Sequence, residues 1–410
     1  MRTKYSIILL IASFLVFVQQ IRSQTVQLSD SSRISLITNT PWNGAVYALF
    51  GHTAIRVTDV SADVDVVFNY GLFDFDSPNF MYRFAKGETD YSVGYTFFPN
   101  YLSIYQLNDI GISEQILNLT LAERQKIVDA LLLNCKPENK TYRYNYFYDN
   151  CSTRPRDIIE NNVSGKIVYQ TSPETSPSTY RKLVHESVNS EPWVRFGIDL
   201  VIGSAADGDG ITQRQEHFLP KYLQHDFTNA VIQNSDATQR RLVLKENELT
   251  KPISRFVGDN LIDTPLLIGI ILLIISVLVS FISFTKDKTF ISNLFDTLLF
   301  AIAGVAGSII FFLMFFSVHP CTNPNWNLMW LNPLQLICSF LFLIKFFSKA
   351  IYYYHFINFV LLIIFLLAWF LITPQYVELA FLPYVLALAI RSGIHIVQYR
   401  RKFKIETDRL

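Results

Sequence analysis

Hydrophobic and polar positions divide the chain into two unlike parts. From residue 24 to about residue 262 the two kinds of residue are mixed, whereas residues 265–398 consist mainly of long apolar runs. Within the first part, alternating stretches at 54–57 and 65–70 predict β-strands. Residues 120–134 predict a helix that opens with a capping box. The first part is therefore expected to be an α+β domain.

The second part contains five apolar runs, each long enough to cross the hydrocarbon core of a membrane. They are residues 265–284, 294–318, 331–347, 356–372 and about 376–397, of which the third is the shortest. A bundle of about five transmembrane helices is therefore expected over residues 263–400, followed by a short tail at 401–410. Arg391 and His395 fall near the end of the last run, where snorkelling toward the lipid headgroups accounts for them.

Positive charge alternates between the ends of these runs. Lysines follow the first run and mark the end of the third, and a basic cluster follows the last: Lys286, Lys288, Lys345, Lys349, Arg400, Arg401, Lys402 and Lys404. The loops 319–332 and 373–378 contain no Lys or Arg. Because cytoplasmic loops are enriched in positive charge, this pattern places the first domain outside the cytoplasm and the C-terminus inside.

Residues 1–23 look like a secretory signal peptide. Arg2 and Lys4 provide a positive start, the apolar run over 5–18 is short for a membrane span, and polar residues follow it. An uncleaved N-terminal anchor is the alternative. A signal peptide requires export of residues 24–262, which agrees with the orientation indicated by the charges.

Composition limits the classes of partner and site. The formal net charge is +1, so a nucleic-acid partner is not indicated. His185, His217 and His225 lack the spacing of zinc ligands, and no metal or cofactor is expected. The four cysteines are too few for a disulfide framework, although an exported domain would permit a bridge between Cys135 and Cys151.

Cys151 is the candidate nucleophile. It lies among residues that cap helices, and Pro155 is tolerated only in a first helical turn, so a helix should begin at about Ser152 or Thr153. The free N–H groups and the dipole of a helix start lower the pKa of a thiol and could bind the oxyanion of a tetrahedral intermediate. His52, near the start of a predicted strand, is the candidate base. Taken alone, each is more commonly a structural residue.

Hairpin geometry suggests a third residue. If the two predicted strands pair across a turn centred near Val60 and Ser61, Asn69 lies opposite His52 on the same face of the sheet. Its amide oxygen would then hold the imidazole in the tautomer that turns the other ring nitrogen toward sulfur. Asp65 is the reserve candidate if the register slips, and a plain strand-end amide is the alternative for Asn69.

Three segments together resemble a known family. Residues 51–57, 69–75 and 148–155 are similar to the periplasmic domain of Lnb-type lipoprotein N-acyltransferases, and the apolar runs that follow are similar to the transmembrane domain of that family. The order of His before Cys resembles the circularly permuted papain-like fold of the NlpC/P60 group. The resemblance implies that Cys151 is the nucleophile and His52 the base, and it does not carry over a third catalytic residue.

The resemblance also implies an activity and a place in the cell. It implies a multi-pass enzyme of a bacterial inner membrane, with its first domain in the periplasm. Such an enzyme moves an acyl chain from a phospholipid to the α-amine of a lipoprotein's lipidated N-terminal cysteine, through a thioester on Cys151. Asn150 and Arg154, beside Cys151, are expected to bind substrate. So is Trp326 in the loop 319–332, for which an interfacial anchor is the alternative.

Two other functions remain open. The same residues could belong to a cysteine peptidase or amidase that acts on cell-wall peptides, with water resolving the thioester, although hydrolysis needs no bundle of membrane spans. A non-enzymatic membrane receptor or assembly protein is the other, and in that case Cys151 is structural. That function predicts a disulfide between Cys135 and Cys151.

Overall fold

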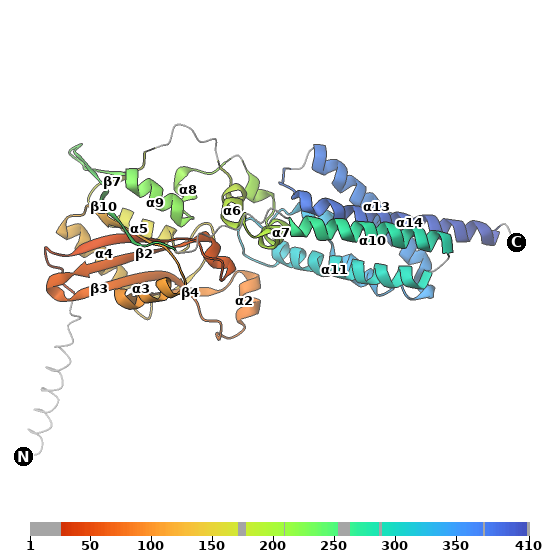
Figure 1. The fold of residues 1–410 in the computed structure, drawn as a ribbon, viewed down its shortest axis with the longest axis horizontal. Helices are drawn as coiled ribbons and strands as arrows, with labels where there is room; N and C mark the ends of the chain where they lie inside the picture. The colour runs from red at the N-terminus through yellow and green to blue at the C-terminus, as the bar shows by residue number, and fades with distance from the viewer. Residues whose placement is uncertain are drawn as a thin grey trace, which may run out of the picture.

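The computed structural model describes residues 26–170, 178–208, 210–252, 263–286, 289–371 and 374–407. The expected signal peptide and the domain boundary near residue 262 lie outside these residues. Figure 1 shows a domain built around a sheet and, beyond it, an elongated helical bundle. The prediction of an α+β domain followed by an all-α region is confirmed.

A seven-stranded antiparallel sheet forms the centre of the N-terminal domain, in the order β10-β5-β1-β2-β3-β4-β6. Its strands are β1 (Arg33–Asn39), β2 (His52–Asp59), β3 (Val64–Leu72), β4 (Asp90–Phe97), β5 (Ile112–Leu117), β6 (Thr141–Arg143) and β10 (Val243–Thr250). The two strands predicted from alternation are the cores of β2 and β3. Successive side chains therefore point to opposite faces of the sheet.

Helices cover both faces. One face packs against three helices, which are α4 (Leu121–Asn134), α5 (Thr153–Asn162) and α9 (Pro220–Asn229). The other packs against α3 (Phe98–Leu107). The predicted capping box opens α4, where Thr120 and Glu123 bond to each other's backbone N–H. The remaining elements of the domain are α2 (Phe80–Lys86), α6 (Tyr180–Val188), α7 (Pro192–Val201), α8 (Gln213–Glu216) and a small sheet of β7 (Lys166–Val168), β8 (Val231–Gln233) and β9 (Gln239–Arg241).

The β2–β3 hairpin differs from the predicted register by two residues. Asn69 lies opposite Ala54 and not opposite His52. The turn sits one residue later than assumed because the Asp59 side chain caps a short 3₁₀ turn and Asp63 adopts a left-handed conformation, with φ of 52°. A shift of two keeps Asn69 on the predicted face, diagonally across from His52.

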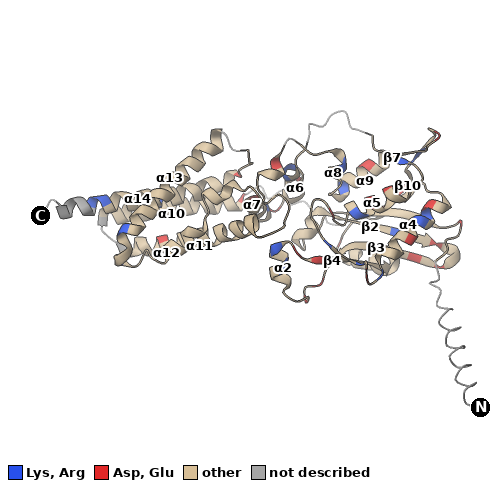
Figure 2. Ribbon diagram, turned by 180° about the vertical axis from the view of Figure 1, so that it is seen from behind, with Lys and Arg blue, Asp and Glu red and all other residues tan. Residues whose placement is uncertain are grey.

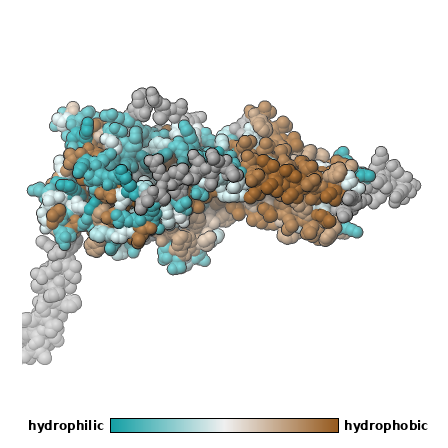
Figure 3. All heavy atoms as spheres, in the orientation of Figure 1, coloured by the Kyte–Doolittle hydropathy of each residue, from teal (hydrophilic) through white to brown (hydrophobic). Residues whose placement is uncertain are grey.

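Four helices of the bundle are long and apolar enough to cross a membrane, counted among the residues that the structure describes. They are α10 (Thr264–Lys286), α11 (Thr289–Phe315), α13 (Ser348–Leu371) and α14 (Leu382–Thr407). Figure 3 shows their apolar surface beside a more hydrophilic N-terminal domain, and Figure 2 shows few charged residues along them. These helices correspond to the first, second, fourth and fifth predicted runs.

The prediction of a continuous helix for the third run is wrong. A short helix, α12 (Pro333–Ser339), is followed by turns and a 3₁₀ segment that ends at Phe347. The Asn293 side chain donates to the carbonyl of Phe342 (3.1 Å), and Thr297 donates to the carbonyl of Ser339 (3.3 Å). The Ser339 carbonyl also accepts from the backbone N–H of Phe342 (3.2 Å), so polar side chains of α11 add hydrogen bonds to the carbonyls of the interrupted segment, as apolar surroundings favour.

The interrupted segment nevertheless runs along α11. Gly307 lies against Asn332 at one end of the segment, and a Cβ atom on Gly304 would come within 2.0 Å of the backbone nitrogen of Leu336. At the other end the segment reaches the first turns of α11 through the Asn293 bond. The segment is therefore antiparallel to α11 and passes along much of its length, so the alternation of chain direction expected from five runs is retained.

A buried ion pair joins three helices of the bundle. Arg391 of α14 binds both carboxylate oxygens of Asp296 in α11 (2.6 and 2.8 Å), and it donates to Ser280 of α10 (2.7 Å). His395 also contacts Asp296, at 2.8 Å. The expectation that Arg391 snorkels is wrong, because Arg391 and Asp296 are fully buried. An ionisable group in this setting is retained only with a partner, which the interior of the bundle supplies.

Replacing Asp296 with Ala should destabilise the bundle strongly. The change leaves the Arg391 guanidinium buried without its counter-charge, which costs about 3–5 kcal/mol in comparable sites. The measurement is the thermal unfolding of the full chain in detergent micelles. A double variant, Asp296→Leu with Arg391→Met, removes both charges and should recover most of the lost stability. Equal melting temperatures for wild type and Asp296→Ala would contradict the assignment.

The N-terminal domain docks on the bundle through α7. The Asn327 amide donates to the carbonyl of Asp199 (2.9 Å), and the Asn325 amide donates to that of Leu200 (2.9 Å). The Gly203 N–H donates to the carbonyl of Cys321 (2.7 Å). These bonds tie the end of α7 to the loop between α11 and α12, which fixes the position of the domain relative to the bundle.

Candidate active site

Cys151 lies immediately before α5, in a turn that the Asn150 side chain holds. The Asn150 Oδ1 atom accepts hydrogen bonds from the N–H groups of Ser152 (2.8 Å) and Thr153 (2.9 Å). The Asn150 amide nitrogen donates to the carbonyls of Tyr146 (2.8 Å) and Phe218 (2.9 Å). The predicted helix start at Ser152 or Thr153 is confirmed, with Ser152 as the N-cap residue.

These bonds give Asn150 a different role from the substrate binding expected. Its side chain is buried, with 4% of the residue exposed, and both of its amide groups are engaged. The N–H groups of Ser152 and Thr153, expected to be free for an oxyanion, are the ones that Asn150 binds. Asn150 therefore caps α5 and fixes the turn that carries Cys151.

The sheet brings His52 and Asn69 to Cys151. His52 begins β2, and its Nε2 atom lies 3.1 Å from the Asn69 Oδ1 atom on β3. An amide oxygen only accepts, so this bond places the proton on Nε2 and leaves Nδ1 for the sulfur. His52 also makes a side-chain hydrogen bond to Cys151. The structure thus brings together the three residues predicted as catalytic, although the register that led to Asn69 was wrong by two positions.

Burial and charge act in opposite directions on the Cys151 thiol. Burial raises its pKa, but the charge of His52, the hydrogen bond to His52, the backbone N–H of Thr53 and the side chain of Tyr144 lower it, and the net pKa lies below the ordinary value. For His52, burial lowers the pKa, but Cys151 and Asn69 raise it more. Both directions favour a thiolate beside an imidazolium.

Tyr144 is a site residue that sequence reasoning missed. Its side chain makes a hydrogen bond to Cys151, and its ring stacks on Tyr91 with the centroids 4.2 Å apart. Gly71 lies beside it at a bulge in β3, with a φ of +91° that favours glycine. Tyrosine at every second position from Tyr142 to Tyr148 was the available signal, because it places alternate rings on one side of an extended segment.

Arg154 and Asp65, two charged candidates, are held by other residues. Arg154 makes a two-bond pair with Asp149 (2.6 and 2.7 Å), and its guanidinium lies 3.5 Å from the centre of the Tyr142 ring. Asp65, the reserve for Asn69, makes a two-bond pair with Arg56 (2.8 Å for both). Arg154 therefore stabilises the turn before α5 through its salt bridge to Asp149, and the Asp65 carboxylate is paired with Arg56.

The loop after α11 reaches the site through residues other than Trp326. Trp326 is half-buried at the domain junction, where its backbone N–H donates to Gln375 (2.8 Å). His319 instead stacks on Tyr146, with the centroids 5.8 Å apart, and the Cys321 sulfur lies 3.8 Å from the Tyr148 hydroxyl. The loop after α11 thus lies against the segment that leads to Cys151.

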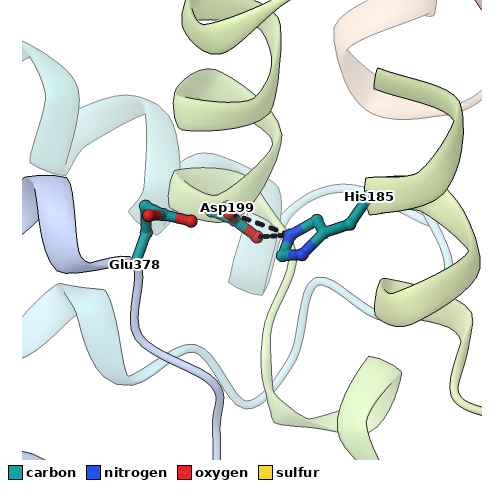
Figure 4. Close-up of side chains that lie close together, drawn as sticks. All are labelled: His185, Asp199 and Glu378. Carbon is teal, nitrogen blue, oxygen red and sulfur yellow. Dashed lines mark hydrogen bonds and ion pairs between the residues drawn. The ribbon is translucent and has the colours of Figure 1, made fainter. Parts of the chain in front are cut away.

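A second cluster of titratable groups lies at the domain junction. His185, Asp199 and Glu378 place ligand-type atoms within 4.8 Å of one another (Figure 4). Each carboxylate already has a cationic partner, since Arg181 lies 2.7 Å from Asp199 and Arg195 lies 2.7 Å from Glu378. These arginines supply the positive charge that a metal ion would bring, so the cluster serves as an ion-pair network that joins the domains.

The cysteines of the N-terminal domain are free thiols. Cys135 and Cys151 form no bond with each other, so the disulfide that a purely structural Cys151 predicts is not present. Cys135 ends α4, and burial raises the pKa of its thiol, in contrast to that of Cys151. The surroundings therefore raise the pKa of the Cys135 thiol and lower that of the Cys151 thiol.

The pH dependence of alkylation tests the electrostatics of the site. Because the pKa of Cys151 is lowered, iodoacetamide should react with it at pH values below the ordinary range of a thiol. His52→Ala should move the midpoint upward by about one pH unit or more, because burial remains and the opposing charge is lost. Mass spectrometry of the modified peptides measures both thiols, with Cys135 as the internal reference.

Tyr144→Phe is the matched variant for this measurement. It removes one hydrogen bond to the sulfur and no charge, so the midpoint should rise by less than in His52→Ala. A midpoint that is the same in wild type and His52→Ala would show that the imidazole does not activate the thiol.

Two family models match the two parts of the chain. Residues 19–186 match the model of the Lnb N-terminal periplasmic domain, and residues 258–402 match the model of the Lnb transmembrane domain. No curated protein and no solved structure gave a significant match. The two matches are in the order of the two parts seen in the structure and together cover most of the chain. The chain is therefore a multi-pass membrane protein of the Lnb family.

Proposed function

We propose that this protein is a thiol-dependent lipoprotein N-acyltransferase. The observation that carries the proposal is the Cys151–His52–Asn69 arrangement, in which the thiol is activated and the imidazole is oriented. The site lies next to the membrane bundle, because His319 in the loop after α11 stacks on Tyr146. An activated thiol beside a membrane suits a reaction in which both substrates are lipids. Membership in the Lnb family supports the same assignment.

The proposal includes a fold and an orientation. A strand that carries the His and a later helix that begins after the Cys follow the circularly permuted order of a papain-like NlpC/P60 domain. We place this domain, residues 24–262, in the periplasm after a signal peptide over 1–23. The bundle, residues 263–400, then lies in the bacterial inner membrane with the tail 401–410 in the cytoplasm. The positive charges near the C-terminal end of α14 and the description of the matched N-terminal domain as periplasmic support this orientation.

The first half-reaction transfers an acyl chain to the enzyme. The Cys151 thiolate attacks the ester carbonyl of a phospholipid, and the tetrahedral intermediate collapses by breaking the bond to the glycerol oxygen. His52, protonated in the ion pair, donates its proton to that leaving oxygen. The products are a thioester on Cys151, a neutral His52 and a lysophospholipid.

The second half-reaction transfers the chain to the lipoprotein. The α-amine of the lipidated N-terminal cysteine has a pKa of about 8, so an appreciable minority of it is already neutral at pH 7. The amine nitrogen attacks the thioester carbonyl, His52 accepts a proton from the nitrogen, and the carbon–sulfur bond breaks. An amide forms, and the Cys151 thiolate and the imidazolium of His52 are restored.

Two hydrogen-bond donors near the sulfur suit both transition states. The backbone N–H of Thr53 and the side chain of Tyr144 bond to the Cys151 thiolate. When the sulfur binds the carbonyl carbon, negative charge moves from the sulfur to the neighbouring carbonyl oxygen. Donors fixed beside the sulfur can then stabilise the oxyanion with little rearrangement. In the proposed reaction they replace the N–H groups of α5, which Asn150 occupies.

Mass spectrometry of lipoprotein N-termini tests the proposed activity. Cells that lack the protein should carry lipoproteins with a free α-amine, and wild-type protein should restore the N-acylated form. Cys151→Ser should restore none of it, because the hydroxyl is a far weaker nucleophile than the thiolate. Cys135→Ser, which alters a second free thiol of the same domain, should behave as wild type. N-acylation that is unchanged in the absence of the protein would contradict the proposal, and cell-wall hydrolysis would then be tested next.

A further inference from the structure

The short helix α2 exposes large apolar side chains to the surroundings. Met81 is 74% exposed and Tyr82 59%, and Phe75 in the preceding loop is 66% exposed. The other face of α2 is packed, because Phe80 is buried and stacks on the Phe84 ring, with the centroids 5.9 Å apart. The segment from Phe75 to Phe84, called the α2 segment below, thus has one packed and one bare apolar side.

The α2 segment packs against α11, one of the helices long and apolar enough to cross a membrane. The Tyr82 ring lies against Phe312 of α11, with the centroids 6.5 Å apart. The backbone N–H of Val318 donates to the carbonyl of Lys86 (2.8 Å), and His319 donates to the carbonyl of Phe84 (2.8 Å). These contacts hold α2 at the end of α11, where the helix leaves the hydrocarbon region.

The last residue of α11 and the residues just after it are apolar and exposed. Phe315, Phe316 and Val318 are each more than half exposed, as lipid-facing side chains of a membrane span are. The bare side of the α2 segment extends this surface from the bundle onto the N-terminal domain. A contiguous exposed apolar patch marks an interaction site, and here the adjoining surface belongs to a helix long and apolar enough to cross a membrane.

Aromatic rings connect the α2 segment with Cys151. Phe75 and Phe80 both contact Phe73, and Phe73 lies 5.3 Å from Tyr91, measured between ring centroids. Tyr91 stacks on Tyr144, which bonds to the sulfur. This series of aromatic side chains, called the aromatic series below, extends from the exposed α2 segment to the Cys151 sulfur. All of its side chains are aromatic, and none is charged.

We propose that the α2 segment inserts its exposed side chains into the outer leaflet of the membrane and that the aromatic series guides a lipid acyl chain to Cys151. The occupant of this surface is a lipid membrane, because the patch continues the lipid-facing surface of α11. The proposed insertion is argued from the exposure of the α2 segment and its contacts with α11. The proposed delivery of an acyl chain rests in addition on the proposed acyltransferase function. An amphipathic segment of this kind lies in the interface with its apolar side among the acyl chains.

Photo-crosslinking of the full chain in vesicles tests the insertion. Benzoylphenylalanine in place of Met81 should form covalent adducts with the phospholipids of phosphatidylethanolamine–phosphatidylglycerol vesicles, detected as mass shifts of the peptide. The matched control is Leu244 on β10, which is 68% exposed. β10 is an edge strand of the sheet, and Figure 1 labels it on the side of the N-terminal domain away from the bundle. Adducts at position 81 and none at 244 are expected. An absence of lipid adducts at 81, or equal yields at the two positions, would overturn the proposal.

Variants of Met81 test the delivery step. Met81→Asp should lower the rate at which vesicle phospholipid acylates Cys151 by about tenfold, because a charge opposes insertion of α2. Alkylation of Cys151 by iodoacetamide should not change, and Met81→Leu should keep the wild-type rate. Leu244→Asp is the control for a charge elsewhere. An unchanged rate in Met81→Asp would overturn delivery through α2, whereas lipid adducts without acylation in the wild type would retain the insertion and reject the acyltransferase function.

Discussion

The interaction between Cys151 and His52 requires that two segments distant in the sequence, β2 and the turn before α5, lie next to each other in the buried interior. Burial disfavours a charged thiol and a charged imidazole, so neither group would ionise there alone. Three bonds fix the geometry that reverses this preference. Asn150 caps α5 and sets the position of the sulfur, Asn69 orients the imidazole, and the backbone N–H of Thr53 reaches the sulfur from β2.

The requirement that buried polar and charged groups have partners also explains the contacts inside the bundle and at its junction with the N-terminal domain. Arg391 and Asp296 are retained inside the bundle because each is the partner of the other. At the junction, Asn325 and Asn327 bind backbone carbonyls at the end of α7 that would otherwise lack a partner. The domain is thereby held in one position over the bundle, with α2 against the end of α11. A fixed position matters for a site whose proposed substrates are embedded in the membrane.

Local features of the sequence were sufficient to predict the elements of the site. Alternation identified β2 and β3, and the capping residues identified the starts of α4 and α5. Asn69 was predicted from a register that was wrong by two residues, and it lies beside His52 only because an even shift preserves the face of a strand. Asn150 and Arg154 were expected to bind substrate because they adjoin Cys151. Asn150 binds the carbonyl of Phe218, 68 residues later, which no local pattern indicates. Arg154 pairs with Asp149, five residues earlier in the same turn.

Tertiary contacts also account for the errors in the bundle. Hydropathy detects a run of apolar residues but not its interruption, so the third run was expected to be one helix. The side chains of Asn293 and Thr297, on a neighbouring helix, bind carbonyls of the interrupted segment in addition to the backbone bonds of its turns. Likewise, the burial of Arg391 follows from a partner 95 residues away, which no local pattern indicates. Tyr144 was missed because the alternating tyrosines indicate rings on one side of a segment but not which of these rings meets the sulfur.

The measurement that tests the central claim most directly is detection of an acyl group on Cys151. Purified wild-type protein in phosphatidylethanolamine–phosphatidylglycerol vesicles, with no acceptor present, should carry a fatty acyl mass on the Cys151 peptide. Hydroxylamine should release it, as expected of a thioester, and a peptide with an N-terminal lipidated cysteine should discharge it as an amide. Detection of lysophospholipid and N-acylated peptide from wild-type protein and also from Cys151→Ser would contradict the account, because the chain would then be transferred without the thiol.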